Sequence, residues 1–241
     1  MKISLVSYLN SYPYHYGLIN AASGLYSELN IVNPAVCARH FIEGKSDVAL
    51  VPVGALVNLS KYQTVLPYCI SANGIVRSVL LLSNKDLKDI KNISPDSHSL
   101  SSNLLLKILC HKHWNIHPAF IRHDDNSADA RVVIGDKAFD LQKEYKYSFD
   151  LSAEWKAMTG LSFVFAAWIA GLNVQKDRLS LLKEALEHGI LNIPAAVNHF
   201  GSSGLLFDDA VSYLTDNIRY RMDASAEEGM KLFLSMAKNI L

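Results

Sequence analysis

Short apolar runs bounded by polar or turn-forming residues recur along the first two thirds of the chain. They predict buried strands at 2–8, 47–53, 64–70, 76–83, 119–123, 131–136 and 163–170. Residues 47–53 are apolar at nearly every position, which is typical of a parallel strand covered on both faces. Helices are predicted between these strands at 13–26, 35–42, 55–60, 103–114 and 150–160. Strands that alternate with helices favour an α/β fold with parallel pairing.

The last third of the chain has a different pattern, because from residue 177 onward it is helical throughout. The predicted helices are 178–188, 190–200, 205–215 and 224–240. The middle section carries its own strands and helices, and the chain would cross into and out of it near 75–78 and 166–169. We therefore predict a two-lobed clamshell, with 1–76 plus 170–241 as lobe one and 77–169 as an inserted lobe two. Each lobe is expected to hold a mixed, mainly parallel sheet flanked by helices, with a cleft and a hinge between the lobes.

Composition narrows the classes of partner. Lys plus Arg and Asp plus Glu number 23 each, and a formal net charge of zero argues against a general nucleic-acid binder. No run approaches the roughly 18 apolar residues of a membrane span, and no basic and apolar leader opens the chain, so we expect a cytoplasmic protein without a membrane partner. The three cysteines, Cys37, Cys69 and Cys110, are odd in number and far apart in the sequence, so we interpret them as buried reduced thiols.

Three histidines gather near Trp114, namely His111, His113 and His117, and superficially resemble a metal cluster. No Cys, Asp or Glu stands at ligand spacing beside them, so no metal is predicted. No cofactor is predicted either. The expected partner is a small molecule, and the expected state is a monomer or a homodimer.

Two clusters of small polar residues precede predicted helices. Asn10 and Ser11 end the first strand, and Ser97, Ser99, Ser101 and Ser102 precede the helix expected to begin near Asn103. Free backbone N–H groups and the helix dipole favour anions at such positions. Two helix N-termini that face each other across a cleft would suit a dicarboxylate. The alternative is that the serines are helix caps and Asn10 a turn residue.

Three further residues stand at candidate positions. Arg77 and Ser78 interrupt an apolar strand at the predicted hinge, where Arg77 either reaches the cleft or lies along an edge. Asp136 follows a strand, which is the usual place for a functional residue, although a cap or turn role is equally compatible. The chain has no nucleophile elbow, dinucleotide fingerprint, phosphate loop or zinc-protease motif. These residues alone predict an anion-binding clamshell and do not select a reaction.

Five segments, in this order, resemble the chorismate dehydratase (MqnA) family of the futalosine route to menaquinone: 6–13, 47–53, 74–81, 134–136 and 150–166. The resemblance implies a type II periplasmic-binding-protein fold used by an enzyme. It also implies a hydro-lyase, a carbon–oxygen lyase that removes water from chorismate to give 3-[(1-carboxyvinyl)oxy]benzoate. Leu100 stands where the family usually has Arg.

The resemblance and the residue types together give the predicted site. The predicted catalytic residues are Asn10, Ser78 and Asp136, and the predicted substrate-binding residues are Tyr8, Ser11, Arg77, Ser99, Ser101 and Ser102. Hydrogen-bond donors at the ring carboxylate would stabilise the charge that develops there, by roughly 3–4 kcal/mol for each good donor. Asp136 or the substrate's second carboxylate would be the base. The alternatives are the related dihydroxynaphthoate synthase of the same pathway and a non-catalytic protein that binds small anions.

Overall fold

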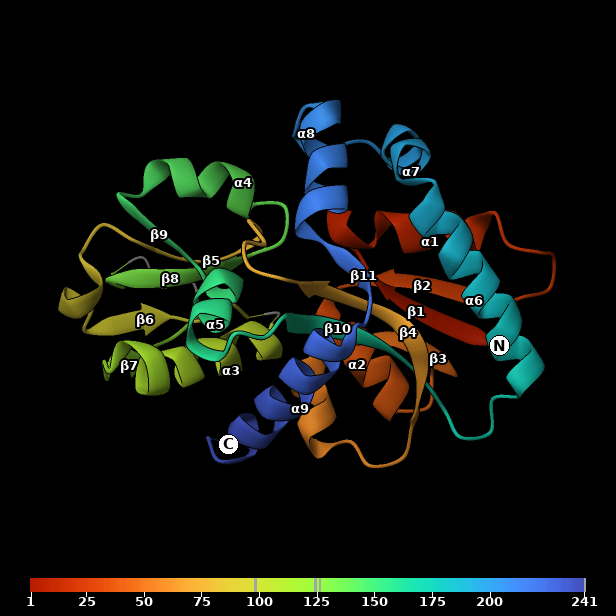
Figure 1. Cartoon of the computed structure of the whole chain (residues 1–241), viewed down its shortest axis with the longest axis horizontal. Helices are drawn as coiled ribbons and strands as arrows, with labels where there is room; N and C mark the ends of the chain where they lie inside the picture. The colour runs from red at the N-terminus through yellow and green to blue at the C-terminus, as the bar shows by residue number, and fades with distance from the viewer. Residues whose placement is uncertain (98, 124, 126, 241) are drawn as a thin grey trace.

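The computed structural model describes residues 1–97, 99–123, 125 and 127–240, and it contains two sheets that lie side by side (Figure 1). The first sheet has the order β11-β4-β10-β3-β1-β2, and the second has the order β7-β6-β8-β5-β9. The strands of the first sheet are β1 (Lys2–Val6), β2 (Glu28–Val32), β3 (Val48–Pro52), β4 (Gln63–Ala72), β10 (Phe163–Ala170) and β11 (Arg219–Arg221). Those of the second are β5 (Val79–Ser83), β6 (Asn92–Ser94), β7 (Ala119–Phe120), β8 (Ala130–Ile134) and β9 (Tyr147–Asp150).

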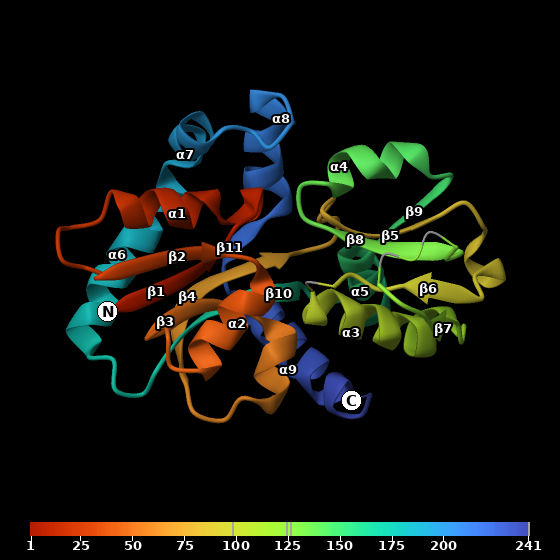
Figure 2. The ribbon, with the colours of Figure 1, turned by 180° about the vertical axis from the view of Figure 1, so that it is seen from behind.

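Helices cover both sheets. The first sheet is flanked by α1 (Tyr12–Ile19), α2 (Pro34–Ile42), α6 (Lys176–Leu191), α7 (Ile193–Phe200), α8 (Phe207–Ser212) and α9 (Ala224–Lys238). The second is flanked by α3 (Leu100–Leu109), α4 (Ala138–Leu141) and α5 (Leu151–Thr159). Figure 2 shows α1 and α6 on one side of the first sheet and α2 with α9 on the other. Two lobes of mixed sheet and helix confirm the predicted clamshell architecture.

Both sheets are mixed, but parallel pairs do not predominate as predicted. In the first sheet β1 pairs in parallel with β2 and β3, whereas β10 is antiparallel to both β3 and β4, and β11 is antiparallel to β4. In the second, β6 is parallel to β7 and β8, whereas β5 is antiparallel to β8 and β9. The way the chain passes between the lobes explains why β4 and β10, two central strands of the first sheet, are antiparallel. Strand β4 leads out of the first sheet and β10 leads back into it, so the two run in opposite directions.

The membership of β10 differs from the predicted division of the chain. Residues 163–169 were assigned to lobe two, yet they pair with β3 and β4 in the first sheet. The chain therefore re-enters the first sheet at Phe163, not near 166–169. The other lobe boundaries stay a prediction.

Several elements differ from the periodicity-based prediction. The predicted helix 13–26 ends at Ile19, and 28–32 form the edge strand β2. The segment expected to be helical from residue 177 onward includes the short strand β11. The predicted helix 55–60 is a 3₁₀ turn, Val53–Asn58, and α3 begins at Leu100 instead of near residue 103.

An aromatic cluster at the junction of the lobes fixes the C-terminal helix. Trp155 of α5, Phe163 of β10 and Phe233 of α9 are buried, with ring centroids 5.1–6.3 Å apart. Helix α9 contacts β10 and also α3 of the second lobe, and Figure 1 shows it running beneath the junction. Aromatic pairs of this kind each add about 0.5–1.5 kcal/mol beyond the area that they bury.

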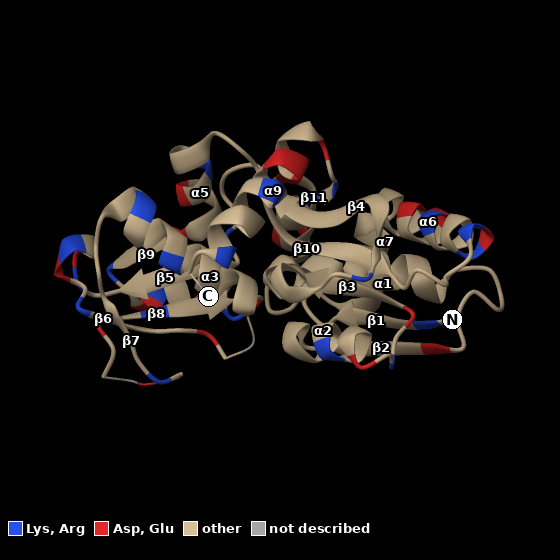
Figure 3. Ribbon diagram, turned by 90° about the horizontal axis from the view of Figure 1, so that it is seen from below, with Lys and Arg blue, Asp and Glu red and all other residues tan. Residues whose placement is uncertain are grey.

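Charged residues lie mainly on the outer elements. Figure 3 shows acidic and basic residues interleaved along α6. Among the helices of the described residues, none has both the length and the apolar character that a bilayer span requires.

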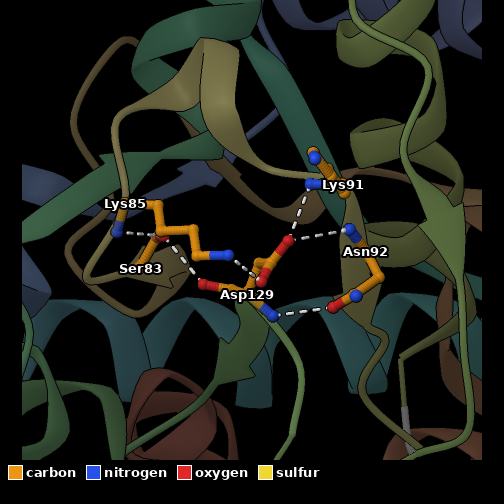
Figure 4. A network of polar contacts seen from close by, with 5 residues as sticks. All are labelled: Ser83, Lys85, Lys91, Asn92 and Asp129. Atoms are coloured by element: carbon orange, nitrogen blue, oxygen red, sulfur yellow. Dashed lines mark hydrogen bonds and ion pairs between the residues drawn. The ribbon is translucent and has the colours of Figure 1, made fainter.

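The outer end of the second sheet is held by a polar network around Asp129 (Figure 4). Its carboxylate accepts hydrogen bonds from the Lys85 ammonium (2.5 Å), the Lys91 N–H (2.8 Å) and the Asn92 N–H (3.3 Å). Its main-chain carbonyl accepts from the Ser83 hydroxyl (2.8 Å). The Lys85 hydrogen bond, followed by those from the two N–H groups, lowers the pKa of Asp129.

We expect Asp129→Ala to lower the free energy of unfolding at pH 7 by about 2–3 kcal/mol, because the two main-chain donors lose a charged acceptor. A carboxyl with a lowered pKa stabilises the fold above its ordinary pKa, and that stabilisation disappears as the pH falls through the folded-state value. Urea unfolding at pH 7 and at low pH measures both effects. The control is Asp140→Ala, whose exposed carboxylate pairs with the exposed Lys143, and it should change stability by less than about 0.5 kcal/mol. An Asp129→Ala deficit that persists unchanged in acid would contradict this account.

Candidate functional site

A pocket lies between the two sheets, and both lobes line it. Its lining residues are Val6, Tyr8, Asn10, Pro34, Pro52, Ile70, Val76, Ser78, Val79, Ser99, Ser101, Ser102, Ile134, Gly135, Phe165 and Ala166. The apolar side chains form the walls, and the polar atoms belong to a few hydroxyls and one amide. A small ligand site commonly has this composition. Among these described lining residues, none is Lys, Arg, His, Asp or Glu.

Six of the nine predicted site residues line the pocket: Tyr8, Asn10, Ser78, Ser99, Ser101 and Ser102. They come from three stretches of the sequence. Tyr8 and Asn10 follow the carboxyl end of β1, Ser78 precedes β5, and the three serines stand at the start of α3. Ser11, Arg77 and Asp136 do not line it. The roles assigned to all nine stay predictions.

The start of α3 supplies three hydroxyls. The Ser99 hydroxyl caps the helix by accepting from the Ser102 N–H (3.2 Å) and donates to the Ser102 hydroxyl (2.7 Å). Ser101 accepts from the main-chain N–H of Gly54 at 2.9 Å. The expected caps, Ser101 and Ser102, lie in the first helical turn because Ser99 takes the capping position. Gly54 belongs to lobe one, so this hydrogen bond joins the two lobes.

Two glycines allow the lobes to approach closely. A Cβ at Gly54 would lie 2.9 Å from the Ser101 Cα and N atoms. A Cβ at Gly135, whose φ is +69°, would lie 2.8 Å from the ring of Tyr8. The Leu9 N–H also donates to the Asp136 carboxylate (3.1 Å) across the same gap. These contacts join the two lobes beside the pocket.

Tyr8 is a neutral donor in this site. Burial, and then the nearby charges of Asp96 and Asp136, raise the pKa of Tyr8 to about 12. The phenol therefore keeps its proton at neutral pH and can donate to an anion.

Asn10 and Ser78 present complementary groups. The Asn10 Oδ1 atom is buried and has no hydrogen-bond partner among the described residues. The Ser78 hydroxyl accepts from the Tyr213 hydroxyl at 2.8 Å. Buried polar atoms in native proteins are normally paired, so the Asn10 oxygen marks a place for a donor from a ligand.

Ser11 and Arg77 are turned to structural contacts. The Ser11 hydroxyl donates to the carbonyls of Val6 (2.5 Å) and Tyr8 (2.7 Å), which fixes the turn before α1. The Arg77 guanidinium lies 5.7 Å from the ring centroid of Phe139. Arg77 has a φ of +65°, so its backbone conformation directs the side chain differently from that of a regular strand residue. A cation in the apolar pocket would also lose hydration without gaining an acidic partner.

Asp136 and Asp150 have their oxygens occupied by the backbone. Burial raises the pKa of Asp136, and its hydrogen bonds with Ser203 and with the Leu9 N–H oppose that shift. Asp150 caps α5 and also accepts from the N–H groups of Val76 (2.9 Å) and Arg77 (2.7 Å). This second carboxylate fixes the segment that joins β4 to β5, next to Ser78.

The histidines near Trp114 have other partners. The His113 ring contacts Glu154 through Nε2 at 3.0 Å, and Glu154 also accepts from the Trp114 indole at 2.9 Å. The rings of His111 and His117 lie 5.1 Å apart. Within the described ranges, no three His, Cys, Asp or Glu side chains converge in the manner of metal ligands.

Sequence reasoning missed Tyr213, which lies on the π-helical turn Tyr213–Asn217 after α8. Its side chain is 1% exposed and it touches Ser78, which is 135 residues earlier in the chain. Nothing in the local helical pattern separates it from an ordinary core tyrosine.

Comparison with known proteins gives similarities over nearly the whole chain. The model of a family described as menaquinone biosynthesis matches residues 1–239. A chorismate dehydratase from Campylobacter jejuni subsp. jejuni serotype O:23/36 (strain 81-176) is 28% identical over 239 residues, which cover 96% of this chain and 91% of that protein.

Two solved structures share the fold at low identity. A protein from Archaeoglobus fulgidus has a TM-score of 0.79 at 15% identity and covers 99% of this chain and 97% of its own. A Candida albicans gene product, described as having the generic periplasmic-binding-protein fold, has a TM-score of 0.69 at 14% identity and covers 100% and 90%. These similarities confirm the predicted periplasmic-binding-protein-like architecture.

Proposed function

Because this chain belongs to the menaquinone biosynthesis family, we propose that it is a chorismate dehydratase, a hydro-lyase that converts chorismate to 3-[(1-carboxyvinyl)oxy]benzoate. The relative from Campylobacter jejuni that bears this name supports the proposal. The observation that carries it is that the buried, unpartnered Asn10 oxygen and the Ser78 hydroxyl line the same pocket. Such a pair can accept from and donate to one substrate hydroxyl.

The proposed reaction removes a proton and a hydroxide from neighbouring ring carbons. The proton comes from the ring carbon that bears the ether oxygen, and the hydroxyl leaves from the next carbon. The electrons of the broken C–H bond form the last double bond of the aromatic ring, and water is released. Removing the proton first sends negative charge through the ring double bond to the ring carboxylate. Neutral donors at that carboxylate would stabilise the charge.

The pocket offers groups both for the substrate carboxylates and for the leaving hydroxyl. We assign the Ser102 hydroxyl and the Tyr8 phenol to the carboxylates as neutral donors on the pocket wall. Ser99 and Ser101 would support this part of the pocket, because their hydrogens go to the Ser102 hydroxyl (2.7 Å) and the Phe165 carbonyl (3.4 Å). Ser78 and Asn10 are assigned to the leaving hydroxyl. Holding these groups and the substrate in one geometry supplies much of the rate enhancement of an elimination that gains aromaticity.

Two groups are candidates for the base that removes the ring proton, Asp136 and the substrate's second carboxylate. The Asp136 side chain does not line the pocket and accepts the Leu9 N–H. This placement favours the other candidate, the enolpyruvyl carboxylate of the substrate itself.

Turnover of chorismate by the purified protein tests the proposal. We expect loss of chorismate absorbance and the appearance of an aromatic acid that mass spectrometry and NMR identify as the 3-substituted benzoate. A reaction without protein controls for spontaneous rearrangement of chorismate. Tight binding of chorismate without turnover would favour the non-catalytic anion-binding protein, and inactivity without binding would favour the related dihydroxynaphthoate synthase.

We place this activity in the cytoplasm. Supporting this are the buried free thiols of Cys37, Cys69 and Cys110, which are typical of a reducing compartment. A monomer or a homodimer remains the expected state.

A further inference from the structure

The Tyr213 hydroxyl forms a buried contact with a pocket residue from the other lobe. It donates to Ser78 Oγ at 2.8 Å, and both side chains are 1% exposed. Tyr213 follows α8 in lobe one, whereas Ser78 immediately precedes β5 of the second sheet. The contact therefore reaches across the junction of the lobes to the edge of the pocket.

The contact fixes which way the Ser78 hydrogen can point. A serine hydroxyl carries one hydrogen and two acceptor positions, and a phenol carries one hydrogen. Tyr213 uses its hydrogen to occupy an acceptor position of Ser78. No second partner of the Ser78 hydroxyl is found among the described residues, and Ser78 lines the pocket. Its hydrogen is therefore free for a ligand.

The surroundings of Tyr213 keep it in this role. Its ring packs edge-on against Phe139, with centroids 5.0 Å apart. Burial raises the pKa of Tyr213, so the phenol stays protonated and acts as a donor to Ser78. The hydrogen bond with Ser78 opposes that shift. Asn10 lines the same pocket, and its buried Oδ1 atom has no hydrogen-bond partner among the described residues.

We propose that Tyr213 is a positioning residue that orients Ser78 as a donor toward one hydroxyl of the bound ligand, in the pocket that the acceptor oxygen of Asn10 also lines. Tyr213 does not itself line the pocket. It acts through Ser78, so that the donor is set before the ligand arrives. Identifying that ligand as chorismate rests on the proposed function.

A double-mutant cycle tests this role. Tyr213→Phe keeps the ring and its packing on Phe139 but removes the hydrogen given to Ser78. We expect kcat on chorismate to fall about tenfold, with KM within about twofold, because the lost orientation affects the reacting hydroxyl more than ground-state binding. In a Ser78→Ala background the same change should alter kcat less than about twofold. Full additivity of the two changes would overturn the proposal.

Tyr14→Phe is the matched control. Tyr14 is another fully buried tyrosine, whose hydroxyl donates to the carbonyls of Cys69 (2.7 Å) and Tyr220 (2.8 Å). It should lose stability in the same way as Tyr213→Phe but keep the wild-type kcat. An equal loss of kcat in both variants would show a merely structural effect and overturn the proposal.

A second readout separates this inference from the proposed function. Crystal structures of the wild type and of Tyr213→Phe report the Ser78 rotamer without any substrate. We expect the Ser78 hydroxyl to leave its position when the phenol is absent, and an unchanged rotamer would overturn the positioning role. A wild-type protein that does not turn over chorismate would overturn the proposed function alone, because the rotamer comparison still decides the role of Tyr213.

Discussion

Replacing Ser78 by alanine is expected to lower kcat on chorismate by about 100-fold, because one preorganised hydrogen-bond donor to developing charge is worth about that factor. Asn10→Ala is expected to lower kcat at least about tenfold, since it removes the acceptor that holds the same hydroxyl. Ser78 is small and lies beside a pocket, so the missing oxygen leaves little void. Steady-state kinetics together with thermal unfolding would separate lost chemistry from lost folding.

Ser83→Ala provides a control at the other end of β5, the strand that follows Ser78. Ser83 is as buried as Ser78, and its hydroxyl donates to the Asp129 carbonyl at the outer end of β5, away from the pocket. It should lower stability and leave kcat unchanged. Wild-type rates in both Ser78→Ala and Asn10→Ala would remove these residues from the site.

Closing the cleft depends on the absence of a side chain at Gly54, so Gly54→Val is expected to reduce kcat/KM strongly. The first added atom would already lie 2.9 Å from the main chain of Ser101, and the valine methyls extend further toward it. Overpacking of this kind costs about 1–3 kcal/mol. If this energy opposes only the closed state, kcat/KM falls by roughly 5- to 150-fold, and valine belongs near the upper end of that range.

Small-angle X-ray scattering with product present would show whether the loss of kcat/KM comes from incomplete closure of the lobes. In that case Gly54→Val should have a larger radius of gyration than the wild type. Gly171→Ala is the control, since its added Cβ meets the Asn173 side chain of the same lobe (2.8 Å) and no atom of the other lobe. Normal kcat/KM in Gly54→Val would mean that the approach of Gly54 to Ser101 is not needed for turnover.

The sequence predicted the parts of the fold that depend on continuous apolar runs. Strand β3 is buried along its whole length and β10 at every position except the half-buried Phe165, and their almost entirely apolar residues indicate this. Strands β2 and β11 were not predicted because they are short, half-exposed edge strands with polar residues. Such strands form because a neighbouring strand offers free backbone N–H and C=O groups. The sequence of the short segment itself does not show that this neighbour will be there.

The same distinction applies to the site. Asn10, Ser78 and the serines of α3 stand where a strand or helix begins or ends, and local patterns reveal such places. The orientation of Arg77 depends on a φ of +65°, which its residue type does not predict. Tyr213 enters the site only through tertiary folding, so no spacing along the chain could have indicated it.

The position of β10 between β3 and β4 has a consequence for synthesis on the ribosome. The chain makes β3 and β4 by residue 72, but the strand that joins them is completed only at residue 170. At about 5–20 residues per second, these roughly hundred residues take about 5–20 s to add. During that time the facing edges of β3 and β4 have no partner, and unpaired strand edges readily recruit other chains. Although its first strands are synthesised early, the first sheet is therefore completed late, and until then its unpaired strand edges are exposed to misassembly.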